Sequence, residues 1–274
     1  MNLFEDQNRE AIRSLNQRGG RMLSLVDLLD AGTINPEMAA EMIYVAAAGG
    51  SFLAAAGPGG TGKTTLMAAA LAFLAPGTEI VTIEGPETLD RLAAATPDHP
   101  QCLVAHEIGP ADFSGYLWGE SVARYFDVAM EPGRCLASNL HAETHPAAKD
   151  QLLGLGVSPR AFGWVSCLAF MAVRGGQRRV TALWATDGSL ALSRPGEPVC
   201  GHRQTWQWRP EDDRFERLAD AAPLIASTRG GLTAATVQGD LDRYRDFLIA
   251  AQAGGVHRME DLRRRALDTL LIPS

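Results

Sequence analysis

The sequence has little that would take the chain into a membrane or onto nucleic acid. Its longest nearly continuous apolar run, residues 66–75, is too short to cross a bilayer. The first six residues lack both the basic and the apolar part of a signal peptide. The 25 basic and 32 acidic residues give a net charge of -7, which disfavours bulk binding to phosphate backbones. We therefore expect a soluble cytoplasmic protein without bulk nucleic-acid binding.

Lysine and cysteine are also scarce. Of the 25 basic residues only Lys63 and Lys149 are lysine, so the position of each lysine is informative. The sequence contains no C-x-x-C motif, and three of the four cysteines lie in apolar runs, where a free thiol packs as a small hydrophobe. We expect reduced core thiols and no metal site at Cys102, Cys135, Cys167 and Cys200.

The centre of the chain alternates short apolar runs with helical stretches. An apolar share of 46% over 274 residues excludes disorder and is enough for one large domain or two small ones. The expected strands are 51–56, 79–84, 101–107 and 134–141, and the expected helices are 64–74, 87–95 and 117–130. This order predicts an α/β fold with a mainly parallel sheet that helices cover on both faces.

The two ends of the chain differ from this centre. The first 50 residues are predicted to be helical, at 5–16, 23–29 and 35–48. The further expected elements are a helix at 147–155, a β-hairpin of 167–173 and 179–186, a second β pair of 205–209 and 214–218, and helices at 233–253 and 259–271. The predicted division is a helical lead-in, 1–50, a core, 51–192, and a small C-terminal module of a hairpin and helices, 193–274.

A glycine-rich loop carries the strongest motif of the sequence. It matches G-x-x-x-x-G-K-[ST] and lies between an expected strand and an expected helix. In such a loop backbone N–H groups surround phosphate oxygens, the lysine reaches the β- and γ-phosphates and the hydroxyl binds Mg²⁺. The alternative is a turn that only joins strand to helix. The candidate nucleotide-binding residues are Gly57, Pro58, Gly59, Gly60, Thr61, Gly62, Lys63, Thr64 and Thr65.

Carboxylates and a histidine follow the other core strands. Glu84 and Glu107 each end an apolar run, where parallel sheets bind ligands, and His141 ends a third. Any one of these residues alone is more often an exposed or structural side chain. Glu120, after Trp118 and Gly119, is a second candidate for the acidic residue beside the magnesium ion, although Glu107 follows the more strand-like run.

These residues together resemble the type II and type IV secretion, pilus and archaellum motor ATPases. The loop matches their Walker A motif, and about four fifths of the chain takes part in the resemblance. The further similar segments are their Asp box at 80–84, their His box at 141–144, their terminal hairpin at 169–186 and the C-terminal region of archaeal-type members at 206–271.

The resemblance implies a RecA-like P-loop ATPase that uses ATP and Mg²⁺. Thr64 and Glu107 would hold Mg²⁺, Glu84 would position or activate the attacking water, and His141 would sense the γ-phosphate. It further implies a homo-oligomeric, hexameric ring with nucleotides at subunit borders. The ring would act on a membrane-embedded secretion or pilus platform.

The sequence also departs from this family. Gly85 stands where the family commonly carries Asp, and the separate N-terminal domain that supplies arginines in trans is missing from the 56 residues before the loop. Arg18 and Arg21 are candidate replacements, the alternative being ordinary surface arginines. Two other functions therefore stay open: a nucleotide-binding regulatory or assembly module with weak turnover, and a DNA-associated RecA-like ATPase, which the negative charge disfavours.

Overall fold

A computed structural model describes residues 4–16, 19–57, 59–111, 113–188 and 201–271. Its strands are β1 (Phe52–Ala56), β2 (Glu79–Thr82), β3 (Gln101–Ile108), β4 (Tyr116–Leu117), β5 (Arg134–His141), β6 (Cys167–Arg174), β7 (Gln177–Thr186), β8 (His202–Arg209) and β9 (Arg214–Arg217). Its helices are α1 (Glu5–Ser14), α2 (Leu25–Asp30), α3 (Pro36–Ala47), α4 (Lys63–Leu71), α5 (Pro86–Ala93), α6 (Glu120–Ala129), α7 (His145–Gly154), α8 (Pro159–Trp164), α9 (Ala221–Thr228), α10 (Ala234–Ala253) and α11 (Met259–Thr269).

The described strands form one sheet, in the order β2-β3-β5-β1-β6-β7-β8-β9, with β4 beside β3. The pairs from β2 to β6 are parallel, and those from β6 to β9 are antiparallel. The strand that precedes the glycine-rich loop, β1, thus lies between β5 and β6. This confirms the predicted α/β fold with a mainly parallel, RecA-like sheet. The second β pair does not stand apart, because β8 and β9 continue this sheet.

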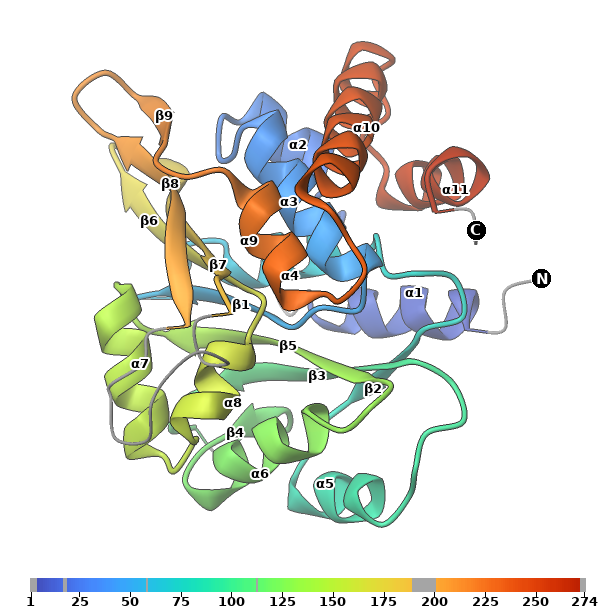
Figure 1. The fold of residues 1–274 in the computed structure, drawn as a ribbon, viewed down its shortest axis with the longest axis vertical. Coiled ribbons are helices and arrows are strands. Elements are labelled where there is room, and N and C mark those ends of the chain that lie inside the picture. Colours follow the sequence, from blue (N-terminus) through green and yellow to red (C-terminus); the bar gives the residue numbers. More distant parts are fainter. Residues whose placement is uncertain (1–3, 17–18, 58, 112, 189–200, 272–274) are drawn as a thin grey trace.

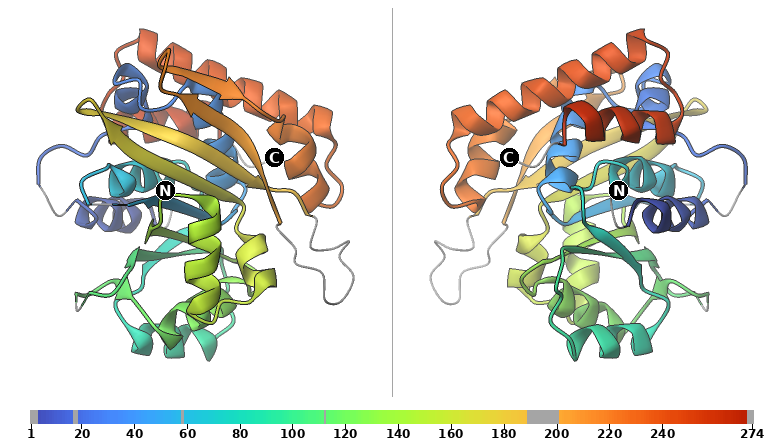
Figure 2. Two further views of the ribbon diagram at one scale, coloured as in Figure 1. Left: turned by 90° about the vertical axis from the view of Figure 1, so that its left-hand side faces the viewer. Right: turned by 90° about the vertical axis from the view of Figure 1, so that its right-hand side faces the viewer.

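Helices cover the sheet on both faces (Figure 1). On one face α5, α6, α7 and α8 cover a core that includes Tyr125, Phe126 and Phe162. On the other face the N-terminal helices α1, α2 and α3 pack with α4 and with the C-terminal helices α9, α10 and α11. Figure 2 shows that segments from the two ends of the chain lie side by side over this second face. The predicted lead-in and C-terminal module therefore share one hydrophobic core.

Polar side chains fix several helix starts. Ser24 and Asp27 form a reciprocal capping box at α2, and the Asn35 side chain accepts from the backbone N–H of Met38 at α3. The ends of the chain are joined by ion pairs between α1 and α11, at 2.7 Å between Arg263 and Glu5 and at 2.9 Å between Arg13 and Glu260. No described helix has both the length and the apolar character needed to span a membrane.

Three elements were absent from the sequence prediction. They are the two-residue strand β4 and the short helices α8 and α9. Residue 117 was predicted to begin a helix, but it belongs to β4, and α6 begins only at Glu120. Elements this short show too few periods for their apolar spacing to identify them, and tertiary pairing decides their form.

Three cysteines lie in the core, as predicted. Cys102, Cys135 and Cys167 are buried free thiols, and Cys200 lies outside the described residues. Burial raises the pKa of the Cys167 thiol, and the neighbouring Cys135 together with burial raises the pKa of the Cys102 thiol. These thiols therefore act as small apolar side chains.

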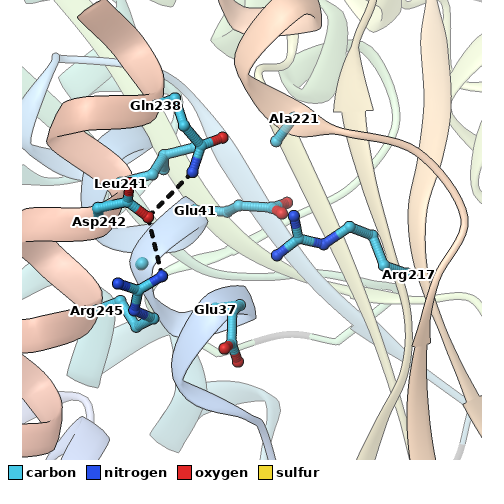
Figure 3. Close-up of a pocket in the computed structure, with 9 residues that line it drawn as sticks. Glu37, Glu41, Arg217, Ala221, Gln238, Leu241, Asp242 and Arg245 are labelled. Atoms are coloured by element: carbon cyan, nitrogen blue, oxygen red, sulfur yellow. Dashed lines mark hydrogen bonds and ion pairs between the residues drawn. The ribbon is translucent and has the colours of Figure 1, made fainter. Parts of the chain in front are cut away.

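A buried carboxyl group joins the N-terminal helices to the sheet. Glu41 of α3 is 6% exposed, and its oxygens accept from Trp206 Nε1 at 2.6 Å and from Thr205 Oγ1 at 3.0 Å, both on β8. Figure 3 shows the small pocket beside it, with the Arg217 guanidinium directed toward Glu41. Burial is the largest effect and raises the pKa of Glu41 from 4.5 to about 7, although its hydrogen bonds oppose this shift.

This carboxyl group makes the stability of the fold depend on pH. Because the pKa of Glu41 is raised to about 7, the folded chain keeps a proton that the unfolded chain releases near pH 4.5. The contribution of the protonated Glu41 carboxyl group to the free energy of unfolding is therefore lost as the pH rises from 4.5 to about 7. We expect Glu41→Gln to raise the free energy of unfolding by about 2 kcal/mol at pH 8 and much less at pH 5, as measured by urea denaturation.

The control is Glu37→Gln, one turn earlier on α3 and at the rim of the same pocket. It should leave the pH dependence of the unfolding free energy as in the wild type. An effect of Glu41→Gln that is the same at both pH values would contradict the buried-proton explanation.

Candidate active site

The glycine-rich loop connects β1 to α4 at the carboxyl end of β1. Gly62 ends the loop with a φ of 99°, in the left-handed region that favours glycine, and α4 begins at Lys63. Gly57 lies so close to Glu143 that a Cβ there would stand 2.2 Å from its Oε1. The loop thus has the strand-loop-helix context that its motif requires. Pro58 lies outside the described residues.

The lysine of the loop is held by the acidic residue of β3. Lys63 Nζ lies 3.1 Å from Glu107 Oε1, and both side chains are buried. His141 Nε2 lies 2.9 Å from the same oxygen, and His141 Nδ1 lies 2.7 Å from the carbonyl oxygen of Gly57. Since both neighbours of the ring are acceptors, both contacts are hydrogen bonds only when the imidazole carries two protons. Glu107 thus contacts both Lys63 and His141, and all three residues are candidates from the sequence analysis.

Glu107 reaches the loop because of a β-bulge in β3. One pair joins Ala105 to Ser138 of β5, whereas the next joins Ile108 to Leu140, so β3 uses one residue more than β5. With strict alternation Glu107 would lie on the same face as Ala105, which α5–α8 cover. The bulge turns Glu107 to the other face of the sheet, where the loop lysine lies.

Asn139 is a site residue that the sequence prediction missed. Its side chain is fully buried, and Nδ2 donates to Thr64 Oγ1 at 2.9 Å and to the carbonyl oxygen of His106 at 2.7 Å. It lies two residues before His141 on β5, so both side chains are on the same face. An amide inside an otherwise apolar strand was the signal that could have identified it.

Buried polar atoms at the loop remain without a hydrogen-bond partner. Among the described residues, Thr61 Oγ1 and Asn139 Oδ1 are buried and make no hydrogen bond. Groups of this kind in a native site commonly await a ligand, a water molecule or an ion. Together with the Thr64 hydroxyl and the Glu107 carboxylate, they form an oxygen-rich set of ligands of the kind that Mg²⁺ prefers.

Glu84 and Glu120 lie farther from the loop. Glu84 follows β2, which β3 and β5 separate from β1, and its carbonyl oxygen accepts from the N–H of Gly115. Glu120 is the first residue of α6. Both side chains are exposed, and within the described part of the chain neither forms a hydrogen bond or ion pair with the loop. The candidates for the acidic residue beside a magnesium ion are Glu107 and Glu120. Among the described residues, Glu107 forms an ion pair with the loop lysine and Glu120 does not.

Of the two arginine candidates of the lead-in, Arg21 is bound to other groups of its own chain. Arg21 makes a two-pronged ion pair with Asp27, at 2.7 and 2.8 Å, and donates to the carbonyl oxygen of His257 at 3.0 Å. These bonds tie it to α2 of its own chain. Arg18 lies outside the described residues.

Burial shifts the pKa values of two residues next to Glu107, one before it on β3 and one opposite it on β4. It lowers the pKa of His106, and it raises the pKa of Tyr116, to which the Glu107 carboxylate adds. The two rings lie with centroids 5.3 Å apart. Residue 106 itself lies within the bulge, and its imidazole, beside the Tyr116 ring, is thus neutral near pH 7.

Asn139 should be essential to the local packing. We expect Asn139→Ala to lower the free energy of unfolding by about 1–3 kcal/mol, because it removes two buried hydrogen bonds and strands the carbonyl oxygen of His106. Asn139→Asp should cost more, since it buries a charge that cannot donate. Urea denaturation measures both. Asn16→Ala, at a partly exposed position, is the control, and a loss no larger than that of Asn16→Ala would refute this role.

No protein-family model and no curated protein matches the chain. Among solved structures it is similar to the VirB11 ATPase of the Brucella suis type IV secretion system, determined in complex with sulphate. The TM-score is 0.39 at 16% sequence identity, and the match covers 53% of this chain and 50% of that chain. The chain thus matches about half the length of that ATPase. An identity and a TM-score this low assign neither a family nor an activity to this chain.

Proposed function

We propose that this chain binds and hydrolyses ATP with Mg²⁺, as a P-loop ATPase that drives a secretion or pilus-like machine. The observation that carries the proposal is the contact of Lys63 with Glu107 at the end of a complete phosphate-loop motif. A lysine on this loop binds β- and γ-phosphates, and a carboxylate on a neighbouring strand binds magnesium. The hydroxyl of Thr64, held by Asn139, completes the set.

The proposed roles follow from the chemistry of the groups. Bound Mg²⁺ would neutralise the charge that develops on the phosphates, with Thr64 and Glu107 as its protein ligands, directly or through water. Lys63 exchanges its contact with Glu107 for a phosphate oxygen, which frees the carboxylate. His141 lies between Glu107 and the loop carbonyl of Gly57, so a phosphate that displaces Glu107 also changes the partners of His141.

Glu84 has a separate role in the proposal. Its exposed carboxylate, at the end of β2, positions or activates the attacking water. It lies across β3 and β5 from the strand that carries the loop, so the role requires approach of Glu84 or of the substrate on nucleotide binding. Glu120 is the alternative to Glu107, not to Glu84, as the acidic residue beside Mg²⁺.

The motor function requires assembly. We infer a homo-oligomeric, hexameric ring with nucleotides at subunit borders, on the cytoplasmic side of a membrane and in contact with a membrane-embedded platform. The resemblance of the loop and box motifs to secretion and pilus ATPases supports this proposal. Arginines that complete the site from a neighbouring subunit belong to the same proposal.

The catalytic assignment predicts how each variant changes the rate of ATP hydrolysis. Lys63→Ala and Glu107→Gln should each lower the rate of phosphate release from ATP at least about a hundredfold, because the first removes a cation at the phosphates and the second removes the carboxylate that would hold Mg²⁺. Glu84→Gln should lower kcat with little change in KM. Phosphate release by the purified full chain measures these rates.

Two controls accompany this experiment. Lys149→Ala removes the other lysine of the chain, which lies on α7, and should leave the rate unchanged. Glu120→Gln should also retain most of the rate. Equal rates in the wild type and Lys63→Ala would refute the proposal, whereas tight binding of ATP without turnover would favour the regulatory module.

The ring predicts an increase in mass with nucleotide. Light scattering of the wild type should show a larger assembly with Mg-ATP than without, and Lys63→Ala should not respond, because its loop cannot hold the phosphates. A monomer under both conditions, with nucleotide bound, would contradict the ring.

A further inference from the structure

The β6–β7 hairpin places an arginine against the glycine-rich loop. Arg178 Nε of β7 donates to the carbonyl oxygen of Gly60 at 3.1 Å. Its Cδ atom would lie 3.1 Å from a Cβ on Gly62, so the missing side chain of that glycine leaves room for the arginine. The contact joins residues 118 positions apart in the sequence. The sequence prediction recognised the hairpin but not this side chain.

Arg178 differs from the other arginines of the hairpin. The next residue, Arg179, is buried and bonded to Asp213 and Gln177, which marks it as a structural residue. Arg178 is exposed and makes no ion pair with any described carboxylate. Its contact with Gly60 uses one of five N–H donors, and within the described residues the other four make no hydrogen bond. A guanidinium with free donors at a phosphate loop suits a phosphate oxygen.

The sheet order fixes the side from which Arg178 approaches. The loop follows β1, and Glu107 and His141 come from β3 and β5 on one side of β1. The hairpin that carries Arg178 begins with β6, on the opposite side. A polyphosphate whose γ-phosphate lies at Lys63 and Glu107 therefore extends its other end toward the hairpin.

We propose that Arg178 is a phosphate-binding residue, supplied by the hairpin of the same chain, for the end of the polyphosphate that lies away from Glu107. It binds nucleoside diphosphates and triphosphates alike and does not distinguish them. This inference rests on the proposed nucleotide binding, and it adds a cation that is not part of the loop motif. The hairpin thereby becomes part of the binding site.

The test is titration calorimetry of the full chain with Mg-ADP and with Mg-ATP. In Arg178→Ala the Kd should rise by about tenfold or more, by the same factor for both nucleotides. Arg178→Lys should recover part of the affinity, because the charge is kept and the fork geometry is lost. Arg174→Ala is the matched control, since Arg174 is exposed on the same hairpin, opposite Gln177.

A second readout separates phosphate binding from bracing of the loop. Raising the salt concentration from about 50 to 500 mM should weaken Mg-ADP binding less in Arg178→Ala than in the wild type, because one screened attraction is gone. An unchanged salt dependence would overturn the inference in favour of a brace. Circular dichroism checks that each variant is folded.

The remaining outcomes test the inference separately from the proposed nucleotide binding. Equal Kd values in Arg178→Ala and the wild type, or a loss limited to Mg-ATP, would overturn the inference and leave the proposed nucleotide binding in place. Failure of the wild type to bind either nucleotide would overturn both. Binding that Lys63→Ala does not weaken would likewise remove the proposed site and this inference together.

Discussion

The site depends on the burial of one ammonium group. Lys63 is 6% exposed, and a charge so far from water requires a counter-charge with good geometry. Glu107 supplies it, and the bulge in β3 turns that carboxylate to the face of the sheet on which the loop lysine lies. Asn139 and His141 fill the space between these strands with polar contacts. The groups that hold this part of the folded chain together are thus the same groups that the proposed nucleotide binding would involve.

The surroundings of the loop are asymmetric. Toward β5 and β3 it meets a carboxylate, an imidazole and an amide, which suit metal and proton chemistry. Toward β6 and β7 it meets a guanidinium, which suits a fixed negative charge. Because β1 is an interior strand of the sheet, its carboxyl end receives side chains from strands on both sides of it.

Helices from the two ends of the chain stabilise this arrangement by packing against the sheet. Helices from both ends share the core on the face of the sheet that holds α4, and Glu41 ties α3 to β8. The antiparallel strands β8 and β9 extend the sheet beyond the hairpin of Arg178. The base of the hairpin is buried and paired with β8, whereas its tip, with the loop-facing arginine, is exposed.

The sequence by itself determined the glycine-rich loop between strand and helix, most strands and helices, and the α/β class, because glycine spacing and apolar periodicity are local properties of the chain. It also indicated Glu107 and His141 by their place at strand ends. Only the tertiary structure decided between Glu107 and Glu120 as the partner of Lys63, brought Asn139 to Thr64 and set Arg178 against Gly60. These contacts depend on a bulge, a strand order and a hairpin that join distant residues, and no local pattern encodes such pairings.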